Sequence, residues 1–267
     1  MNKLVRYGAI AIGAAMMSSH SVPAQEAGDV ADDSNASGEL SLVEALVAAE
    51  TALGAVAPEE TLNVAAAVAI RATVPAGSSG TASGVDMESA MAALSETAPE
   101  ELAALLAVAE SLRAVAPSEI EATAAAEQSL AAEAPAEFIA YTRNLIALSA
   151  AAPEEAAQAN MAEVSLAAVA PEEFAGYAAA YAAAAASKVK EPGDALGAAT
   201  SSLAAAAPLK HAALSDANTR LANAAPEEFK ARDAAEIAMA ATAPDEYAAL
   251  HAALARLAAA SLQAPRP

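Results

Sequence analysis

Apolar side chains recur along this chain with a period of eighteen residues, which equals five turns of α-helix. We number each repeat unit from the position that proline usually occupies, taken as position 0. Leucine or methionine occupies position 13 in nearly every unit, and larger apolar side chains gather at positions 3, 6 and 10. These positions span an arc of about 80° on a helical wheel, which predicts an amphipathic helix in every unit. The units begin at residues 40, 58, 81, 99, 117, 135, 153, 171, 190, 208, 226 and 244.

Proline opens most units, and acidic residues follow it directly, as in Glu100–Glu101, Glu154–Glu155 and Glu227–Glu228. Proline is tolerated at the first helical position, whereas in a helix interior it costs about 3 kcal/mol. The acids then lie in the first turn, where they interact favourably with the positive end of the helix dipole. The pattern therefore predicts one helix of about fourteen residues and a turn of about four in each unit, with kinked continuous helices as the alternative.

Two consecutive units would form a helical hairpin of about 36 residues, a length close to known helix-pair repeats. The predicted fold is all-α: about twelve short helices, paired as hairpins, in an α-solenoid or extended helical array. Two segments interrupt the period, a glycine- and serine-rich insertion at 76–80 and a basic stretch at 188–194, and both are interpreted as surface loops. The Trp-Leu-Gly-Tyr signature of tetratricopeptide repeats is absent, so the pattern assigns the chain to no family.

The ends of the chain differ from the repeat region. Residues 1–24 combine a basic start, a short apolar run and small residues before Gln25, which predicts a signal peptide and an exported, periplasmic or extracellular protein. Residues 25–38 are acidic without apolar periodicity and predict a disordered leader. The helical repeat domain is expected over 39–262, followed by a disordered tail at 263–267. The sequence contains no cysteine, so its stability has to come from packing.

The chain is strongly acidic, with 34 Asp and Glu against 13 Lys and Arg and a formal net charge of −21. Such a charge repels nucleic acid phosphates and anionic lipid surfaces. We therefore expect no nucleic-acid partner, and the charge disfavours a membrane surface. The acidity itself is interpreted as a solubilising feature of an alanine-rich surface.

Residue types that carry chemistry are scarce. The three histidines are His20 in the signal segment, His211 at position 3, where a packed, hydrogen-bonded side chain is expected, and His251 at position 7. Without cysteine or a paired histidine motif, no zinc or di-iron site is predicted. The acidic doublets could form a row that binds Ca²⁺, but dipole capping explains them better. No nucleophile elbow or phosphate-binding loop is present, so we predict no enzyme, no cofactor, and no catalytic or metal-binding residue.

The predicted function is therefore that of a non-enzymatic scaffold or protein-binding module, whose partner is another protein or a second copy of itself. Five aromatic side chains cluster in three consecutive units and are candidates for a binding surface, although core packing explains them better: Phe138, Tyr141, Phe174, Tyr177 and Tyr181. Two alternatives stay open. The proline-punctuated helices are similar in general plan to apolipoprotein-like proteins that bind a lipid surface, and repeat ends without polar caps would permit self-assembly.

Overall fold

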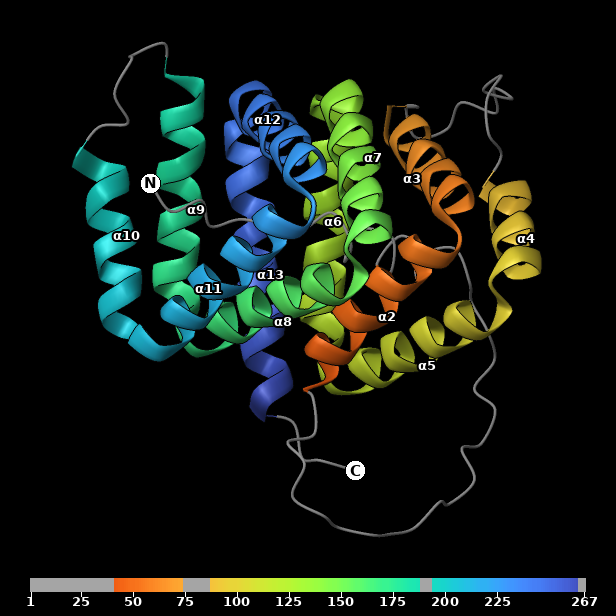
Figure 1. Cartoon of the computed structure of the whole chain (residues 1–267), viewed down its shortest axis with the longest axis horizontal. Coiled ribbons are helices and arrows are strands. Elements are labelled where there is room, and N and C mark those ends of the chain that lie inside the picture. Colours follow the sequence, from red (N-terminus) through yellow and green to blue (C-terminus); the bar gives the residue numbers. More distant parts are fainter. Residues whose placement is uncertain (1–40, 74–86, 188–193, 264–267) are drawn as a thin grey trace, which may run out of the picture.

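The computed structural model describes residues 41–73, 87–187 and 194–263. The predicted signal peptide, the leader, the insertion at 76–80, residues 188–193 of the predicted basic loop and residues 264–267 of the predicted tail lie outside these ranges. Asp194, the last residue of that predicted loop, begins a helix instead. Gln263, which was assigned to the tail, is instead the last residue of a helix. Within the described ranges the chain forms twelve helices and no strand (Figure 1): α2 (Leu42–Val56), α3 (Pro58–Thr73), α4 (Met87–Thr97), α5 (Pro99–Val115), α6 (Pro117–Glu133), α7 (Pro135–Ala151), α8 (Pro153–Val169), α9 (Pro171–Ala186), α10 (Asp194–Ala206), α11 (Pro208–Ala224), α12 (Pro226–Thr242) and α13 (Pro244–Gln263).

The all-α repeat is confirmed, and nine of its helices begin at the proline of their unit. The helices are longer than expected, because most complete units form seventeen helical residues and a single non-helical one. That residue is the alanine before the proline, with φ between −128° and −144° and ψ between 57° and 70°. The residue before a proline is excluded from the α region, and one such residue is enough to turn the chain. Between α2 and α3 the turn is 115°.

The backbone hydrogen bonds continue on both sides of each break. Ala134, for example, donates to the carbonyl of Leu130 at 2.9 Å and accepts from the amide of Phe138 at 2.9 Å. Nine such alanines separate consecutive helices, and all are buried, because their small side chains lie where two helices meet: Ala57, Ala98, Ala116, Ala134, Ala152, Ala170, Ala207, Ala225 and Ala243. A short side chain at the break therefore permits the close approach that the bend requires.

The expected pairing of neighbouring units into hairpins differs from the observed packing. Helices separated by one residue touch only near their shared end, since a single residue cannot reverse the chain. Side-by-side packing of consecutive helices occurs for α3 with α4 and for α9 with α10. These are the two places where the period is interrupted and more residues separate the helices. The helices on either side of each interruption therefore pack as hairpins, and the regular units form bends.

The helices instead pack as two matching halves, α2–α7 and α8–α13. In each half, the first helix packs against the fourth and the sixth, and the second packs against the third, the fifth and the sixth. Contacts between the halves match as well. The first helices of the two halves, α2 and α8, pack against each other. The fifth helix of each half packs against the sixth helix of the other, as α6 does with α13 and α12 with α7. The matching contacts indicate that the two halves are related by approximate two-fold symmetry, like the two subunits of an isologous dimer joined into one chain. It makes Ala152, between α7 and α8, the junction of the halves.

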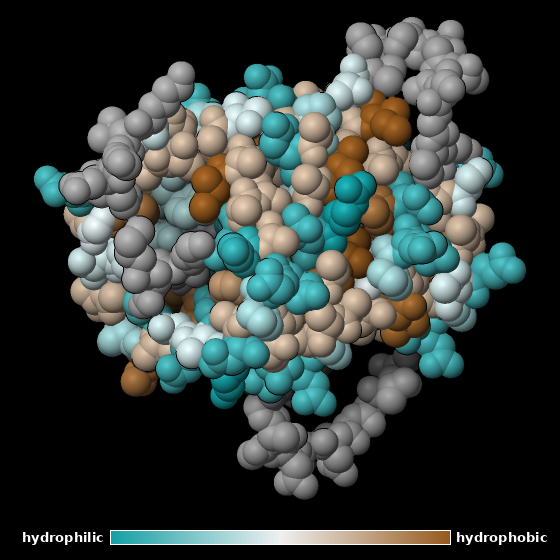
Figure 2. All heavy atoms as spheres, turned by 45° about the horizontal axis from the view of Figure 1, so that its top comes forward, coloured by the Kyte–Doolittle hydropathy of each residue, from teal (hydrophilic) through white to brown (hydrophobic). Residues whose placement is uncertain are grey.

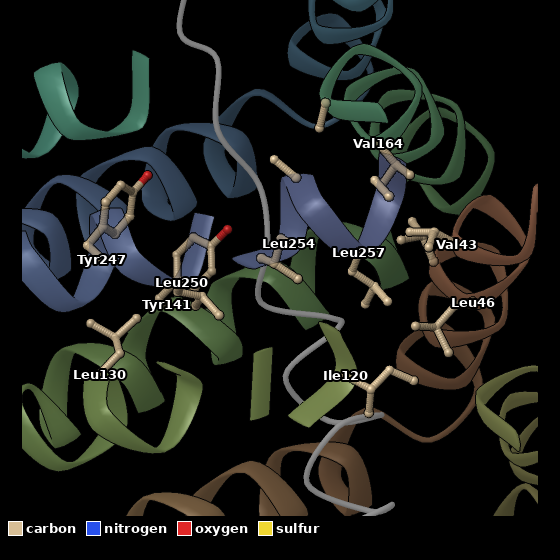
Figure 3. Close-up of a cluster of buried hydrophobic side chains, with 14 of the residues drawn as sticks. Val43, Leu46, Ile120, Leu130, Tyr141, Val164, Tyr247, Leu250, Leu254 and Leu257 are labelled. Atoms are coloured by element: carbon tan, nitrogen blue, oxygen red, sulfur yellow. The ribbon is translucent and has the colours of Figure 1, made fainter. Parts of the chain in front are cut away.

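The core lies along α13, which packs against α9, α6 and α8 and runs through the middle of the molecule (Figure 1). Figure 3 shows Tyr247, Leu250, Leu254 and Leu257 from this helix among side chains of α2, α6, α7 and α8. All ten leucine and methionine side chains at repeat position 13 are buried, as the pattern predicts: Leu53, Leu94, Leu112, Leu130, Leu148, Leu166, Leu203, Leu221, Met239 and Leu257.

Candidate functional site

Repeat position 10 places four glutamates in the interior of the protein. Glu50, Glu127, Glu163 and Glu236 belong to α2, α6, α8 and α12, and all four are buried. They form two matching pairs between the halves, since Glu50 corresponds to Glu163 and Glu127 corresponds to Glu236. Glutamate is rarely buried unless it is paired, so these positions are the first candidates for a functional role.

Glu236, on α12, lies in a buried network with Arg232. The Nη1 atom of Arg232 donates to Oε2 of Glu236 at 3.2 Å, and its Nη2 atom lies 3.0 Å from Oδ1 of Asp233. The hydroxyl of Tyr247 donates to Oε1 of Glu236 at 2.8 Å. The Arg232 guanidinium also lies 4.8 Å from the ring centre of Phe229, in cation–π geometry. One cation is thus neutralised by two carboxylates inside the C-terminal half.

Burial and the neighbouring carboxylates shift the pKa values of two groups in this network, Arg232 and Tyr247. Burial lowers the pKa of Arg232, but the carboxylates of Glu236 and Asp233 outweigh it, and the net pKa shift is upward. Burial, followed by the nearby Glu236 carboxylate, raises the pKa of the Tyr247 phenol well above its usual value. The phenol therefore remains protonated at neutral pH and acts as a hydrogen-bond donor. Arg232 is therefore a cation and Tyr247 a neutral donor within this buried network.

Aromatic rings extend the network along α9 and α13. The ring centres of Tyr177 and Tyr181 are 6.2 Å apart, those of Tyr181 and Tyr247 are 5.8 Å apart, and those of Tyr247 and His251 are 4.1 Å apart. These spacings are typical of aromatic pairs that contribute to packing. The row joins the two helices at the centre of the C-terminal half.

The five aromatic candidates for a binding surface lie mostly in the core. Phe138, Tyr141, Phe174 and Tyr177 are buried, and Tyr181 is half-buried. The core-packing interpretation is therefore confirmed for the first four. Burial and then the nearby Glu236 carboxylate raise the pKa of Tyr181 above its ordinary value, which keeps its hydroxyl protonated as well.

The histidines have different environments. His251 is buried, its Nδ1 atom lies 2.7 Å from the carbonyl oxygen of Tyr247, and burial lowers its pKa to about 4, so its ring is neutral at neutral pH. His211 is half-buried, and within the described residues its buried Nε2 atom has no hydrogen-bond partner. The expected packing is thus partly observed, whereas the expected hydrogen bond is missing at that atom. His20 lies outside the described ranges.

The acidic doublets lie in the first turns of their helices, as predicted from the position of the prolines. Over 41–73, 87–187 and 194–263, no three His, Cys, Asp or Glu side chains come close enough together to hold a metal ion. In the first turns, the doublets place negative charge next to the positive end of the helix dipole.

The network residues were missed by the sequence interpretation, although a signal for them exists. The pattern predicts apolar side chains at positions 6 and 10, but position 10 carries glutamate in four units, and the unit at 226 also carries Arg232 at position 6. Arg232 and Glu236 stand four residues apart on the buried face, the spacing at which side chains on a helix meet. Two opposite charges at core positions of one helix thus predict a buried ion pair.

No described helix is both long and apolar enough to cross a membrane by itself, and only the bent pair α2 and α3 reaches that composition when taken together. Comparison with known proteins identifies no relative, since no family model, curated protein or solved structure matches this chain.

Proposed function

We propose that this protein is an exported, non-enzymatic scaffold that binds a protein partner through its acidic, alanine-rich surface. The observation that carries this proposal is the burial of the one charged network described above. Arg232, Asp233, Glu236 and Tyr247 pair with one another inside the C-terminal half, and none is exposed to a substrate. A reaction site requires reacting groups within hydrogen-bond reach of the substrate.

The surface supports recognition of a basic partner. The helix N-termini carry acids that are exposed or half-buried, and the first half of the repeat is especially acidic: residues 41–151 contain 15 acidic and 3 basic residues. Figure 2 shows one face, on which hydrophilic residues are interspersed with weakly hydrophobic ones. Complementary charge speeds the encounter of two proteins and selects between partners. A lysine- or arginine-rich protein segment is the partner class that this surface fits.

The packing favours this function over the lipid-binding alternative. Over the described residues, the apolar stripes at positions 3, 6 and 13 are largely buried against other helices and are not available to a lipid surface. Among the described residues, the large apolar side chains that are exposed come from six different helices: Val56, Leu106, Val115, Val169, Leu209, Ile237 and Leu262.

We expect circular dichroism to show full helicity without lipid and no gain in helix when phosphatidylcholine vesicles are added. A gain in helix would support the lipid-binding alternative.

A pull-down from native extract tests the proposal with a matched charge variant. In that variant, four exposed or half-buried acids at two helix starts become glutamine: Glu154, Glu155, Glu172 and Glu173. We expect the wild type to retain a specific basic protein that the variant retains less strongly and that is released at about 1 M salt, where the Debye length is about 3 Å. Equal retention by both proteins, independent of salt, would argue against recognition through acidic groups. Light scattering distinguishes a monomer from the self-assembly alternative.

A further inference from the structure

The two halves of the molecule allow each buried glutamate to be compared with its counterpart. Glu127 on α6 and Glu236 on α12 occupy position 10 of the fifth helix of their halves. The two helices have matching neighbours, since α6 packs against α3 and α13 while α12 packs against α9 and α7. Glu127 and Glu236 are therefore equivalent carboxyl groups in equivalent surroundings, and differences between them come from the side chains nearby.

The partners of Glu236 have no equivalent around Glu127. Thr123 stands at the position that matches Arg232, and its hydroxyl donates to a backbone carbonyl on its own helix at 2.8 Å. Phe138 stands at the position that matches Tyr247 and has no hydroxyl to donate. Within the described part of the chain, both carboxyl oxygens of Glu127 lack a hydrogen-bond partner, and its exposed fraction is only 1%.

Surrounding charges do not compensate for this burial. Burial raises the pKa of Glu127 well above its usual value, and it is the only cause of that shift. Of the titratable side chains on the helices that touch α6, only Tyr141, Tyr247 and His251 are buried. On α6 itself and on α3, α13, α5 and α7, the remaining groups are exposed or half-buried: Glu119, Glu121, Glu133, Glu59, Glu60, Arg71, Asp245, Glu246, Arg256, Glu100, Glu101, Glu110, Arg113, Glu137 and Arg143.

We propose that Glu127 is a proton-binding site that couples pH to the packing of α6 against α3 and α13. With the proton bound, the side chain is neutral and fits the apolar interface between these helices. When the proton is lost, an unpaired carboxylate is left in the interior, and α6 loosens so that water can reach it. The C-terminal half does not respond in this way, because Arg232 neutralises the carboxylate at the equivalent position.

The direction of the pH effect follows from the two protonation states. The unfolded chain has an ordinary glutamate with a pKa of about 4.3, whereas the pKa in the folded state is raised. The stabilisation from proton binding is complete below the unfolded pKa and is lost as pH rises through the folded pKa. Between these values, the ratio of folded to unfolded protein falls about tenfold for each pH unit.

The test compares Glu127→Gln with Glu121→Gln, an exposed acid on the same helix, in the full chain. Urea unfolding is measured at about pH 5 and about pH 8, on either side of the range in which the raised pKa is expected to act. From about pH 5 to about pH 8, we expect the ratio of folded to unfolded protein for Glu127→Gln to increase at least about tenfold relative to the same ratio for the wild type. For Glu121→Gln, we expect the ratio to change as it does in the wild type. His251 is present in all three proteins, so its own titration cancels. If the change in stability between the two pH values were the same for Glu127→Gln as for the wild type and Glu121→Gln, the proposal would be overturned.

A second variant and a local measurement keep the test independent of one substitution. Glu127→Leu removes the polar group altogether. Its folding ratio is expected to change between the two pH values as that of Glu127→Gln does, even if its absolute stability differs. Hydrogen exchange, corrected for the intrinsic effect of pH, is expected to show less protection in α6 at high pH in the wild type and unchanged protection in α12. Equal loosening of α6 and α12, or a loss of protection in α6 that persists in Glu127→Leu, would contradict the assignment of the site.

Discussion

Replacing Arg232 with methionine is expected to lower the free energy of unfolding by about 3–5 kcal/mol. Methionine approximates the length of the aliphatic stem but removes the cation, which leaves the carboxylates of Asp233 and Glu236 buried next to each other without their partner. Breaking one side of a buried ion pair has this large effect because the remaining charge keeps its desolvation penalty. Urea unfolding followed by circular dichroism measures the change.

A matched control separates loss of the buried cation from loss of any arginine. Arg220 is an exposed arginine on α11, and Arg220→Met is expected to change stability by less than about 0.5 kcal/mol. Replacing the whole network with apolar residues of similar volume, through Arg232→Met, Asp233→Leu, Glu236→Leu and Tyr247→Phe together, should recover much of the loss. Similar small effects of Arg232→Met and Arg220→Met would show that the network contributes little to the fold.

Replacing Ala134 with leucine is expected to destabilise the protein by about 1–3 kcal/mol. Ala134 lies at the break between α6 and α7, its exposed fraction is 0%, and both of its backbone groups are hydrogen-bonded. Three additional carbon atoms at this position have to displace the packed ends of two helices. In a chain of this size, each kcal/mol lowers the melting temperature by about 2–4 °C, which thermal unfolding detects readily.

The control for this substitution is Ala136→Leu, which places the same side chain two residues further along α7 at an exposed position. Because it adds no buried volume, we expect an effect within about 0.5 kcal/mol of zero. If Ala134→Leu proved as harmless as Ala136→Leu, the small side chain would not be a requirement of the bend. The nine buried alanines would then need another explanation.

The period of the sequence was sufficient to predict individual helices. Proline fixes where a helix begins, and the apolar face at position 13 identifies side chains such as Leu112 and Leu130 as core residues, which is what the structure shows. The helix length was underestimated because a turn was assumed to need several residues. One alanine in a non-helical conformation is sufficient, since a proline excludes only its immediate predecessor from the α region.

The pairing of helices could not be obtained from the period, because every unit presents nearly the same stripe. A repeated stripe specifies that helices pack but not which helices meet. The information lay in the exceptions, where the interruptions between α3 and α4 and between α9 and α10 fall at matching places in the two halves. Recognising that correspondence in the sequence would have predicted two six-helix halves.

The candidate network was only partly predictable for a related reason. Arg232 and Glu236 are neighbours on one helix, so their spacing alone indicates an ion pair. Tyr247 lies beyond the next bend, and its hydroxyl reaches Glu236 because of how α12 and α13 are arranged. The contrast between Glu127 and Glu236 was even harder to predict from the sequence, because it depends on knowing which positions of the two halves correspond.

The two halves of the molecule pack against each other, and a cross-link between α2 and α8 tests this arrangement most directly. The Nδ2 atom of Asn160 lies 3.1 Å from Oγ1 of Thr51, although the residues are 109 positions apart. The chain contains no cysteine, so Thr51→Cys with Asn160→Cys introduces the only two thiols. The control pairs Thr51→Cys with Gln158→Cys, which is exposed on the same helix.

Mild oxidation, or a short bifunctional thiol reagent, should link the two introduced thiols at positions 51 and 160 within one monomer. Peptide mapping and the loss of both free thiols would show this link. The control pair should react far less. This result would place α2 of one half against α8 of the other, as the closed arrangement requires. Two thiols that stay free, or that link only separate molecules, would contradict it and favour an extended array of neighbouring hairpins.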